Sequence, residues 1–316
     1  MEHDPITKVV DLSVIVPVYN EEAVLWELYK HLDPVLEGMK ISYEVILVND
    51  GSNDNSQEII RQIIKQNSNY KGISFSRNFG HQIALSAGLD FTLGRAVVTI
   101  DADLQDPPEV IPKLWEKWNQ GFEVVCAQRE SRQDSAFKRL TAYCFYRILN
   151  KLSEVPIQLD TGDFRLLDQK VVNTLRHFKE RNRFLRGLFG WTGYKQVIVP
   201  FDRQPRFAGK THYPLMKMVK FAFDGIISFS SVPLRLATWL GIICSLIGFL
   251  GIIYVIIIRF LPIYNVSGWA AMMTAILFLG GVQLLIMGMI GEYLSRIYTE
   301  VQNRPLYIIR EKIGFK

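Results

Sequence analysis

Short apolar runs alternate with mixed polar and apolar segments along the first part of the chain. The apolar runs predict strands at Leu12–Val18, Tyr43–Val48, Gly72–Ser76, Ala96–Ile100 and Gly121–Ala127. The mixed segments predict helices from Asn20 to about Gly38, from the turn ending at Ser56 to about Gln66, and from about Gly80 to Leu93. This alternation predicts an α/β fold, in which a mostly parallel sheet carries helices on both faces.

The last third of the chain has a different pattern, with two long stretches that contain no charged residue. They are Leu236–Ile258, over 23 positions, and Val266–Gly291, over 26 positions. A helix of either length can cross a hydrocarbon core of about 30 Å. Buried helices of a soluble core are the alternative, but they rarely need so many consecutive apolar residues. We therefore expect two transmembrane helices, at about 236–258 and 267–291.

Basic residues flank these stretches on both outer sides. They are Lys217, Lys220 and Arg235 before the first, and Arg296, Arg304, Arg310, Lys312 and Lys316 after the second. Only Arg259 lies between the stretches, so the positive-inside rule predicts that both termini are cytoplasmic. The N-terminal residues lack the basic and apolar regions of a signal peptide, which agrees with this orientation.

The sequence thus predicts a multi-pass protein of the cell membrane, that is, the inner or plasma membrane. We expect a cytoplasmic domain over 1–210, an amphipathic juxtamembrane segment over 211–232, the two membrane helices over 233–293 and a cytoplasmic tail over 294–316. The net charge of +5 is too small and too dispersed to indicate nucleic acid, and anionic lipid is the simpler partner. The three cysteines lack metal-ligand spacing and are expected to be reduced.

Two common phosphate-binding motifs are excluded. No G-x-G-x-x-G follows the first strand, which argues against a dinucleotide-binding dehydrogenase. Gly209-Lys210-Thr211 resembles the end of a P-loop, but Gln204 stands where that motif requires glycine.

Two carboxylates, Asp101 and Asp103, follow the Ala96–Ile100 run. Alternate residues of an extended segment point the same way, so the two side chains, with Gln105 one step further, are expected to converge at the carboxyl end of a strand. Open α/β sheets bind ligands there. Such a pair suits Mg²⁺ or Mn²⁺, which completes its ligands with water and diphosphate oxygens. The alternative is that these acids only cap the next helix, near Glu109.

Three motifs in order carry a resemblance to a known family. They are Val16–Glu21, Val48–Ser52 and Asp101–Gln105. Together they resemble the family 2 glycosyltransferases, whose GT-A fold binds a nucleotide sugar across the strand ends. Asp160–Arg165, Arg206–Thr211 and the two apolar stretches are similar to those of the polyprenyl-phosphate glycosyltransferases, which include dolichol-phosphate mannose synthases. The bactoprenol glucosyltransferases of this group look closest.

The resemblance implies inverting transfer of a monosaccharide, most simply glucose from UDP-glucose, to undecaprenyl or another polyprenyl phosphate. GDP-mannose or a UDP-linked aminosugar is the alternative donor. A processive polysaccharide synthase would carry Q-x-x-R-W, which is missing here. A non-catalytic scaffold or flippase partner would lose Asp50, Asp101 or Asp103, which are all present. The resemblance also favours a homo-oligomer, for example a tetramer, with a separate flippase.

The same resemblance assigns roles to individual residues. It implies Asp103, then Asp101, as metal ligands, with Gln105 as a neutral third ligand. Asp101, Arg206 and Lys210 should contact the nucleotide sugar, and Arg206 and Lys210 lie on a loop that can close over the diphosphate. Arg129 and Arg139 should bind the acceptor phosphate. Asp160, then Asp163, should orient a substrate or act as a base. Solvated surface charges, or an acid paired with Arg165, are the alternatives.

The nucleotide pocket is expected at the ends of the first two strands. Pro17, Tyr19 and Glu21 should line it, and Asp50 should accept a hydrogen bond from the base or the ribose. The structural alternatives are a helix cap for Glu21 and an Asx-turn for Asp50. In the second apolar stretch, Gln283 is expected to hydrogen-bond another helix.

Overall fold

A computed structural model describes residues 10–129, 161–202 except 179, 182 and 184, 232–259 and 268–315. The chain forms two compact units. The described residues before 203 and after 303 belong to the first unit, and those from 232 to 303 belong to the second. The juxtamembrane segment expected at 211–232 lies outside the described residues, apart from Val232.

The described residues of the first unit form an eight-stranded sheet in the order β7-β5-β6-β4-β1-β2-β3-β8. The strands are β1 Leu12–Val18, β2 Tyr43–Asn49, β3 Tyr70–Phe75, β4 Ala96–Thr99, β5 Val124–Arg129, β6 Thr161–Asp168, β7 Gln196–Phe201 and β8 Ile309–Ile313. Strands β4, β1, β2 and β3 are parallel neighbours, whereas β6 and β8 run antiparallel to theirs. The predicted mostly parallel sheet is confirmed.

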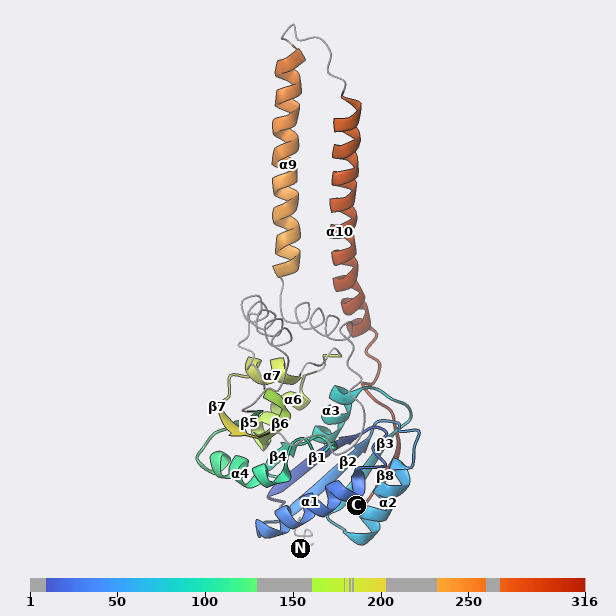
Figure 1. Ribbon diagram of the computed structural model, residues 1–316, viewed down its shortest axis with the longest axis vertical. Coiled ribbons are helices and arrows are strands. Elements are labelled where there is room, and N and C mark those ends of the chain that lie inside the picture. The colour runs from blue at the N-terminus through green and yellow to red at the C-terminus, as the bar shows by residue number, and fades with distance from the viewer. Residues whose placement is uncertain are drawn as a thin grey trace, which may run out of the picture. The chain divides into compact units, whose positions relative to one another are not determined.

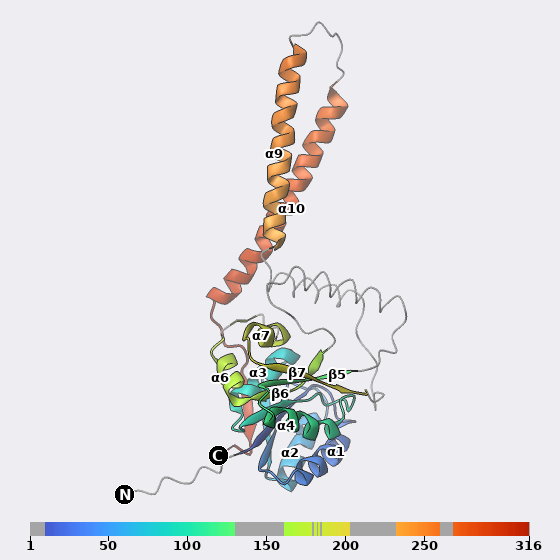
Figure 2. The same ribbon diagram turned by 90° about the vertical axis from the view of Figure 1, so that its left-hand side faces the viewer.

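Helices cover both faces of this sheet (Figure 1, Figure 2). They are α1 Leu25–Gly38, α2 Ser56–Gln66, α3 His81–Phe91, α4 Ile111–Asn119, α6 Gln169–Arg176 and α7 Leu185–Trp191, with a 3-10 turn at Pro108–Val110. Helix α1 begins at Leu25 rather than at the expected Asn20. Residues 20–24 instead form a turn at the edge of the sheet.

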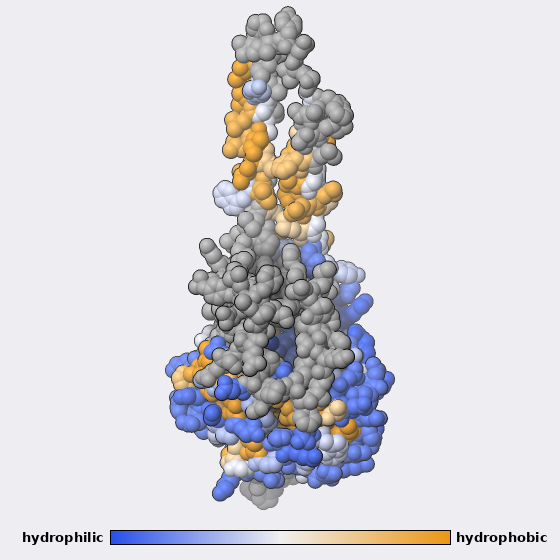
Figure 3. Space-filling view, in the orientation of Figure 1, coloured by the Kyte–Doolittle hydropathy of each residue, from blue (hydrophilic) through white to orange (hydrophobic). Residues whose placement is uncertain are grey.

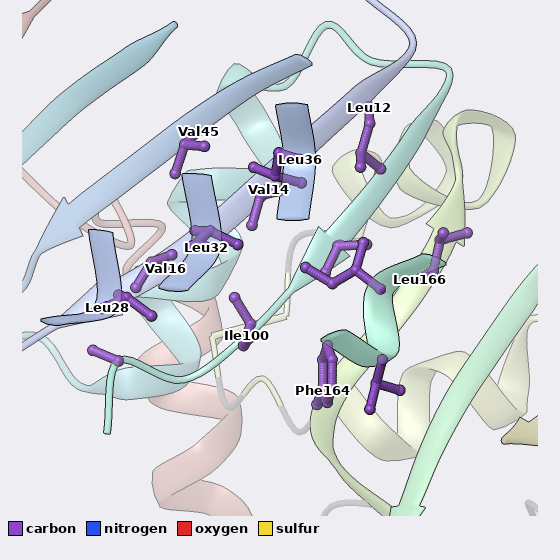
Figure 4. Packing of buried hydrophobic residues seen from close by; sticks show 14 of the residues in the cluster. Leu12, Val14, Val16, Leu28, Leu32, Leu36, Val45, Ile100, Phe164 and Leu166 are labelled. Carbon is purple, nitrogen blue, oxygen red and sulfur yellow. The ribbon is translucent and has the colours of Figure 1, made fainter. Parts of the chain in front are cut away.

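Helix α1 illustrates how the core forms. Its buried leucines, Leu25, Leu28, Leu32 and Leu36, recur every three or four residues and so share one face of the helix. That face packs on the side of the sheet that carries Val14 and Val16, in a continuous cluster of buried residues (Figure 4). The leucines on one face of α1 and the alternate valines of β1 therefore pack together in one core.

Strand β8 was not expected from the sequence, which predicted only a tail there. It pairs antiparallel with β3, with Ile73 opposite Lys312. Glu311 accepts a hydrogen bond from Arg61 Nη2 at 2.7 Å and another from Gln57 Nε2 at 3.1 Å. The residues that follow the second unit thus return to the sheet of the first.

The second unit contains α9 Val232–Arg259 and α10 Trp269–Val301, which contact each other. Helix α9 extends beyond its expected span of 236–258 at both ends, whereas α10 begins at Trp269, within its expected span of 267–291, and extends past the end of that span. Among the described residues, the helical segment Phe278–Val301 is long and apolar enough to cross a membrane, and Ala237–Gly251 is a shorter apolar segment. Figure 3 shows hydrophobic surface on the described side chains of both helices. The two-span expectation therefore stays a prediction.

The packing of α3 on β1 yields a stability test. A Cβ added at Gly88 would lie 2.3 Å from Ile15 Cγ2, closer than any real contact. We expect Gly88→Val to cost about 1–3 kcal/mol of stability, because overpacking forces the helix from the sheet. The thermal unfolding midpoint of the purified protein measures this change. Gly38→Val is the matched control, since nothing lies within 4 Å of its added Cβ. Equal midpoints for the two variants would contradict the packing.

Candidate active site

The turns that follow β1 and β2 are bonded to each other at the carboxyl edge of the sheet. The Asn20 N–H donates to Ser52 Oγ at 2.9 Å, and the Asn53 N–H donates back to Asn20 Oδ1 at 2.8 Å. The Glu22 N–H donates to Asp54 Oδ2 at 3.1 Å. Because β1 and β2 are adjacent parallel strands, both turns lie at the same edge. The mutual bonds fix their shape.

The residues expected to line a nucleotide pocket occupy different depths in this edge. Pro17 is buried within β1, opposite Val48 of β2, so it shapes the strand end without an exposed surface. Tyr19 is 44% exposed. The Glu21 carbonyl accepts the Leu25 N–H at the start of α1, and Val24 occupies the N-cap position of that helix. Contacts of these residues with a nucleotide stay a prediction.

Asp50 lies deeper than the sequence suggested. Only 2% of the residue is exposed. Its Oδ1 accepts the Phe79 N–H at 2.7 Å, and its Oδ2 accepts the Gly80 N–H at 2.9 Å. Burial raises the pKa of Asp50, although these two bonds oppose the rise. The carboxylate therefore fixes the entry into α3, a role the sequence did not predict, and its contact with a nucleotide stays a prediction.

Next to Asp50, the backbone at Gly51 lies very close to the backbone at Arg77 and Asn78. Gly51 has a φ of +67°, and an added Cβ would lie 2.4 Å from the Arg77 carbonyl carbon. Only glycine suits both the left-handed conformation and this contact. The loop after β2 and the loop after β3 therefore touch through their backbones, next to the amino end of α3.

The carboxylates after β4 lie in a turn rather than along an extended strand. Strand β4 ends at Thr99. The Gln105 N–H donates to Asp103 Oδ1 at 3.1 Å, and Leu104 has a φ of +56°. The strand alternation expected over Asp101, Asp103 and Gln105 is therefore wrong beyond Thr99, because the turn replaces it. Asp101 and Asp103 still lie at the carboxyl end of β4, as predicted.

Asp101 lies close to other charged groups. Its Oδ1 is 3.6 Å from His81 Nε2 at the start of α3. Burial raises the pKa of Asp101 to about 6, and nearby carboxylates, first that of Asp163, add to the rise while His81 opposes it. Burial is thus the main cause of the raised pKa, and a bound cation would favour the ionised form of the Asp101 carboxylate.

Asp163 lies on β6, and both of its side-chain oxygens accept hydrogen bonds. Its side chain is 8% exposed. Arg186 of α7 donates Nε to Asp163 Oδ1 at 2.9 Å and Nη2 to Oδ2 at 3.1 Å. Gln82 Nε2 donates to Oδ2 at 3.0 Å, and His81 Nε2 lies 3.3 Å from it. Burial alone would raise the pKa of Asp163, but Arg186 and His81 hold it well below its usual value.

Asp163 is therefore not paired with Arg165, which was the alternative from the sequence. Arg165 donates Nη2 to the Gly162 carbonyl at 2.6 Å and lies 4.3 Å from the centre of the Phe189 ring. The segment is a strand rather than a loop, and its alternation places Asp163 beside α3 and α7.

Several predicted site residues cannot be placed. Asp160, Arg139, Arg206 and Lys210 lie outside the described residues. Arg129 ends β5, but its side chain is also outside them. Their expected roles stay predictions.

Three side chains that the fold brings to this edge were not predicted from the sequence: His81, Gln82 and Arg186. The first two open the helix that follows the third parallel strand, so the rule applied to the other strand ends could have found them. Arg186 carries no such signal, because it follows an antiparallel strand and comes from a separate helix.

The residues present fit a divalent ion. Asp101 Oδ1 is buried and has no hydrogen-bond partner among the described residues. In the same part of the chain, no group of three or more His, Cys, Asp or Glu side chains is arranged to hold a metal. Asp101 and Asp103 offer hard oxygen ligands, and one or two carboxylates are what Mg²⁺ takes from a protein when substrate phosphates supply other ligands.

Comparison with known sequences identifies the family. Glycosyl transferase family 2 matches residues 13–176, and the family described as GtrB C-terminal hairpin matches residues 232–297. The chain belongs to glycosyl transferase family 2. It is a glycosyltransferase whose first match spans the strands and helices around Asp50, Asp101 and Asp163.

Two relatives align over nearly the whole chain. The uncharacterized glycosyltransferase YkcC of Bacillus subtilis is 47% identical over 308 residues, which cover 97% of this chain and 95% of that protein. The bactoprenol glucosyl transferase of Shigella phage SfX is 41% identical over 302 residues, which cover 95% and 99%. A solved structure of S. aureus TarS with UDP-GlcNAc is more remote, at 17% identity and a TM-score of 0.47 over 69% of this chain and 66% of that one.

The two bonds at Asp50 yield a prediction. Asp50→Asn places an amide NH₂ against the Phe79 or Gly80 N–H and leaves a buried donor unpaired. We expect a loss of about 1–3 kcal/mol of stability, measured as a lower thermal unfolding midpoint without nucleotide. Glu58→Gln, at an exposed site on α2, is the control. An unchanged midpoint with weaker UDP binding alone would show that Asp50 acts only on the nucleotide.

Proposed function

We propose that this glycosyltransferase moves a monosaccharide from a nucleotide sugar to a polyprenyl phosphate at the cytoplasmic face of a membrane, with inversion at the anomeric carbon. UDP-glucose is the favoured donor and undecaprenyl phosphate the favoured acceptor. The observation that carries the proposal is the pair Asp101 and Asp103 at the carboxyl edge of the sheet, in a chain 41% identical to a bactoprenol glucosyl transferase. The apolar helices α9 and α10 would anchor the chain in the membrane that contains the lipid acceptor.

Donor binding is assigned to the edge formed by the ends of β1, β2 and β4. Asp103 and Asp101 would hold Mg²⁺ or Mn²⁺, with Gln105 beside them, and a bound ion would offset charge on the departing diphosphate. Tyr19 and Glu21 would contact the nucleoside, with Pro17 and Asp50 shaping the walls. Arg206 and Lys210 would contact the diphosphate, because a guanidinium and an ammonium both pair with phosphate.

Attack by a lipid phosphate has little need of a general base. A lipid phosphate is anionic at neutral pH and can attack the anomeric carbon without losing a proton first. Asp163 is poorly suited to accept a proton, because Arg186, Gln82 and His81 surround its oxygens. We therefore assign Asp160 to orienting a substrate and Arg129 and Arg139 to the acceptor phosphate.

Chain connectivity supports two membrane crossings. Strand β8 belongs to the same sheet as β1 to β4, so the chain is on one side of any membrane both before α9 and after α10. The number of crossings between them must then be even. If Phe278–Val301 of α10 crosses once, a second crossing must lie between β7 and β8, and we assign it to α9, which contains the apolar segment Ala237–Gly251. At about 1.5 Å per residue, both helices are long enough.

An assay with defined donors tests the reaction. Purified protein is incubated with polyprenyl phosphate in membranes and with UDP-glucose, GDP-mannose or UDP-linked aminosugars. We expect an acid-labile glycolipid from UDP-glucose, lost in EDTA and restored by Mg²⁺ or Mn²⁺. Asp103→Ala should lose most of this activity, whereas Glu109→Gln, an exposed site nearby, should keep it. Absence of product with every donor would overturn the proposed function.

A labelling experiment tests the topology. Single cysteines in a cysteine-free variant, placed in the connecting segment 260–267 and after residue 316, are exposed to an impermeant maleimide on sealed vesicles. We expect the two positions to react from opposite sides, since two crossings return the chain to its starting side. Labelling of both positions from the same side would contradict the two-span arrangement.

A further inference from the structure

We propose that His81 is a positioning residue for Asp101: it connects the Asp101 carboxylate to the fixed Asp163–Arg186 pair and so orients Asp101 for the metal ion and the donor diphosphate. This inference rests on the proposed function and adds a residue to it. His81 lies on a different element from both carboxylates. The tertiary structure, rather than closeness in the sequence, brings His81 next to Asp101.

The anchor of the arrangement is Asp163. Both of its oxygens receive Arg186, and Gln82 occupies Oδ2 as well. Gln82 is fixed in turn, because its Oε1 accepts the Leu185 N–H at 3.2 Å. Strand β6 and helices α3 and α7 thus meet at one carboxylate.

His81 stands between this anchor and Asp101. Its Nε2 is 3.3 Å from Asp163 Oδ2 and 3.6 Å from Asp101 Oδ1. The second distance is too long for a hydrogen bond, and Asp101 Oδ1 has no hydrogen-bond partner among the described residues. The role needs only an N–H at Nε2, which neutral and charged imidazole both supply.

The main chain around His81 is fixed on the preceding side as well. Asp50 accepts the N–H groups of Phe79 and Gly80, the two residues before His81. The main chain that carries His81 is therefore held in place, and the imidazole itself is positioned by its contact with Asp163 Oδ2. Without it, Asp101 would lose the N–H that lies between it and Asp163, while the Asp163, Asp106 and Asp103 carboxylates would still repel it.

The test compares His81→Ala with His81→Gln, whose terminal amide N–H can reach the position of Nε2. Full-length protein in detergent is titrated with Mn²⁺ in the presence of UDP, and free Mn²⁺ is followed by electron paramagnetic resonance. We expect His81→Ala to weaken Mn²⁺ binding by about 10- to 100-fold, the usual effect of removing a group that orients a metal ligand. His81→Gln should recover most of the affinity.

His31→Ala is the matched control, because His31 is an exposed histidine on α1 that pairs with Glu27. It should bind Mn²⁺ as the wild type does. Wild-type affinity in His81→Ala, or a loss in His81→Gln equal to that in His81→Ala, would overturn the inference. The proposed function fails separately, if the wild-type protein yields no glycolipid in the donor assay.

A double variant adds a second measurement that does not depend on one substitution alone. If His81 acts from the Asp163 anchor, then Asp163→Asn also weakens Mn²⁺ binding, and combining it with His81→Ala adds little further loss. Fully additive losses would show that the two residues act independently and would overturn the inference. Donor KM should rise more than kcat falls in His81→Ala, because the change acts on binding.

Discussion

The buried carboxylate of Asp163 is the interaction on which the arrangement of the candidate site depends. A carboxylate that is 8% exposed is costly unless donors surround it. Arg186 from α7 and Gln82 from α3 supply them, so the charge on β6 forces two helices into fixed positions. The amino end of α3, with His81, then lies beside Asp101. Removing Arg186 would leave this buried charge with only Gln82 and His81 beside it and would affect all three elements.

The sequence was sufficient to predict the parallel part of the sheet and the edge that carries the site. Local signals determine both: β-branched runs mark β1, β2 and β4, a shorter apolar run marks β3, and polar residues follow their carboxyl ends. The details of that edge depend on contacts distant in sequence. Asp50 binds N–H groups near residue 80, and Asp163 binds Arg186, so no local pattern could show that these acids are buried and already occupied. At Asp103, a turn hydrogen bond replaced the expected strand alternation.

Strand β8 is a second case in which the local sequence pattern does not reveal a contact between distant segments. The segment Ile309–Ile313 alternates apolar and charged residues over only five positions, which is too short to distinguish an edge strand from a tail. Its pairing with β3 is stabilised by Glu311, which contacts Arg61 and Gln57 of α2. Helices over the two apolar stretches were easier to predict, because the length of each stretch and its lack of charged residues are enough to indicate a long apolar helix. The family match over residues 232–297 agrees with a hairpin there.

The segment between α10 and β8 also holds the C-terminal end of α3 in place. Tyr307 stacks on Phe75 at the end of β3, with ring centres 5.2 Å apart, and its hydroxyl donates to Asp90 Oδ2 of α3 at 2.8 Å. Asp50 binds the residues that precede the same helix. Helix α3 is therefore fixed at both ends, by Asp50 of the candidate site at its start and by Tyr307 near its end. Because Tyr307 follows α10 closely in the chain, the segment that leaves the apolar hairpin is bonded directly to the helix that begins with His81.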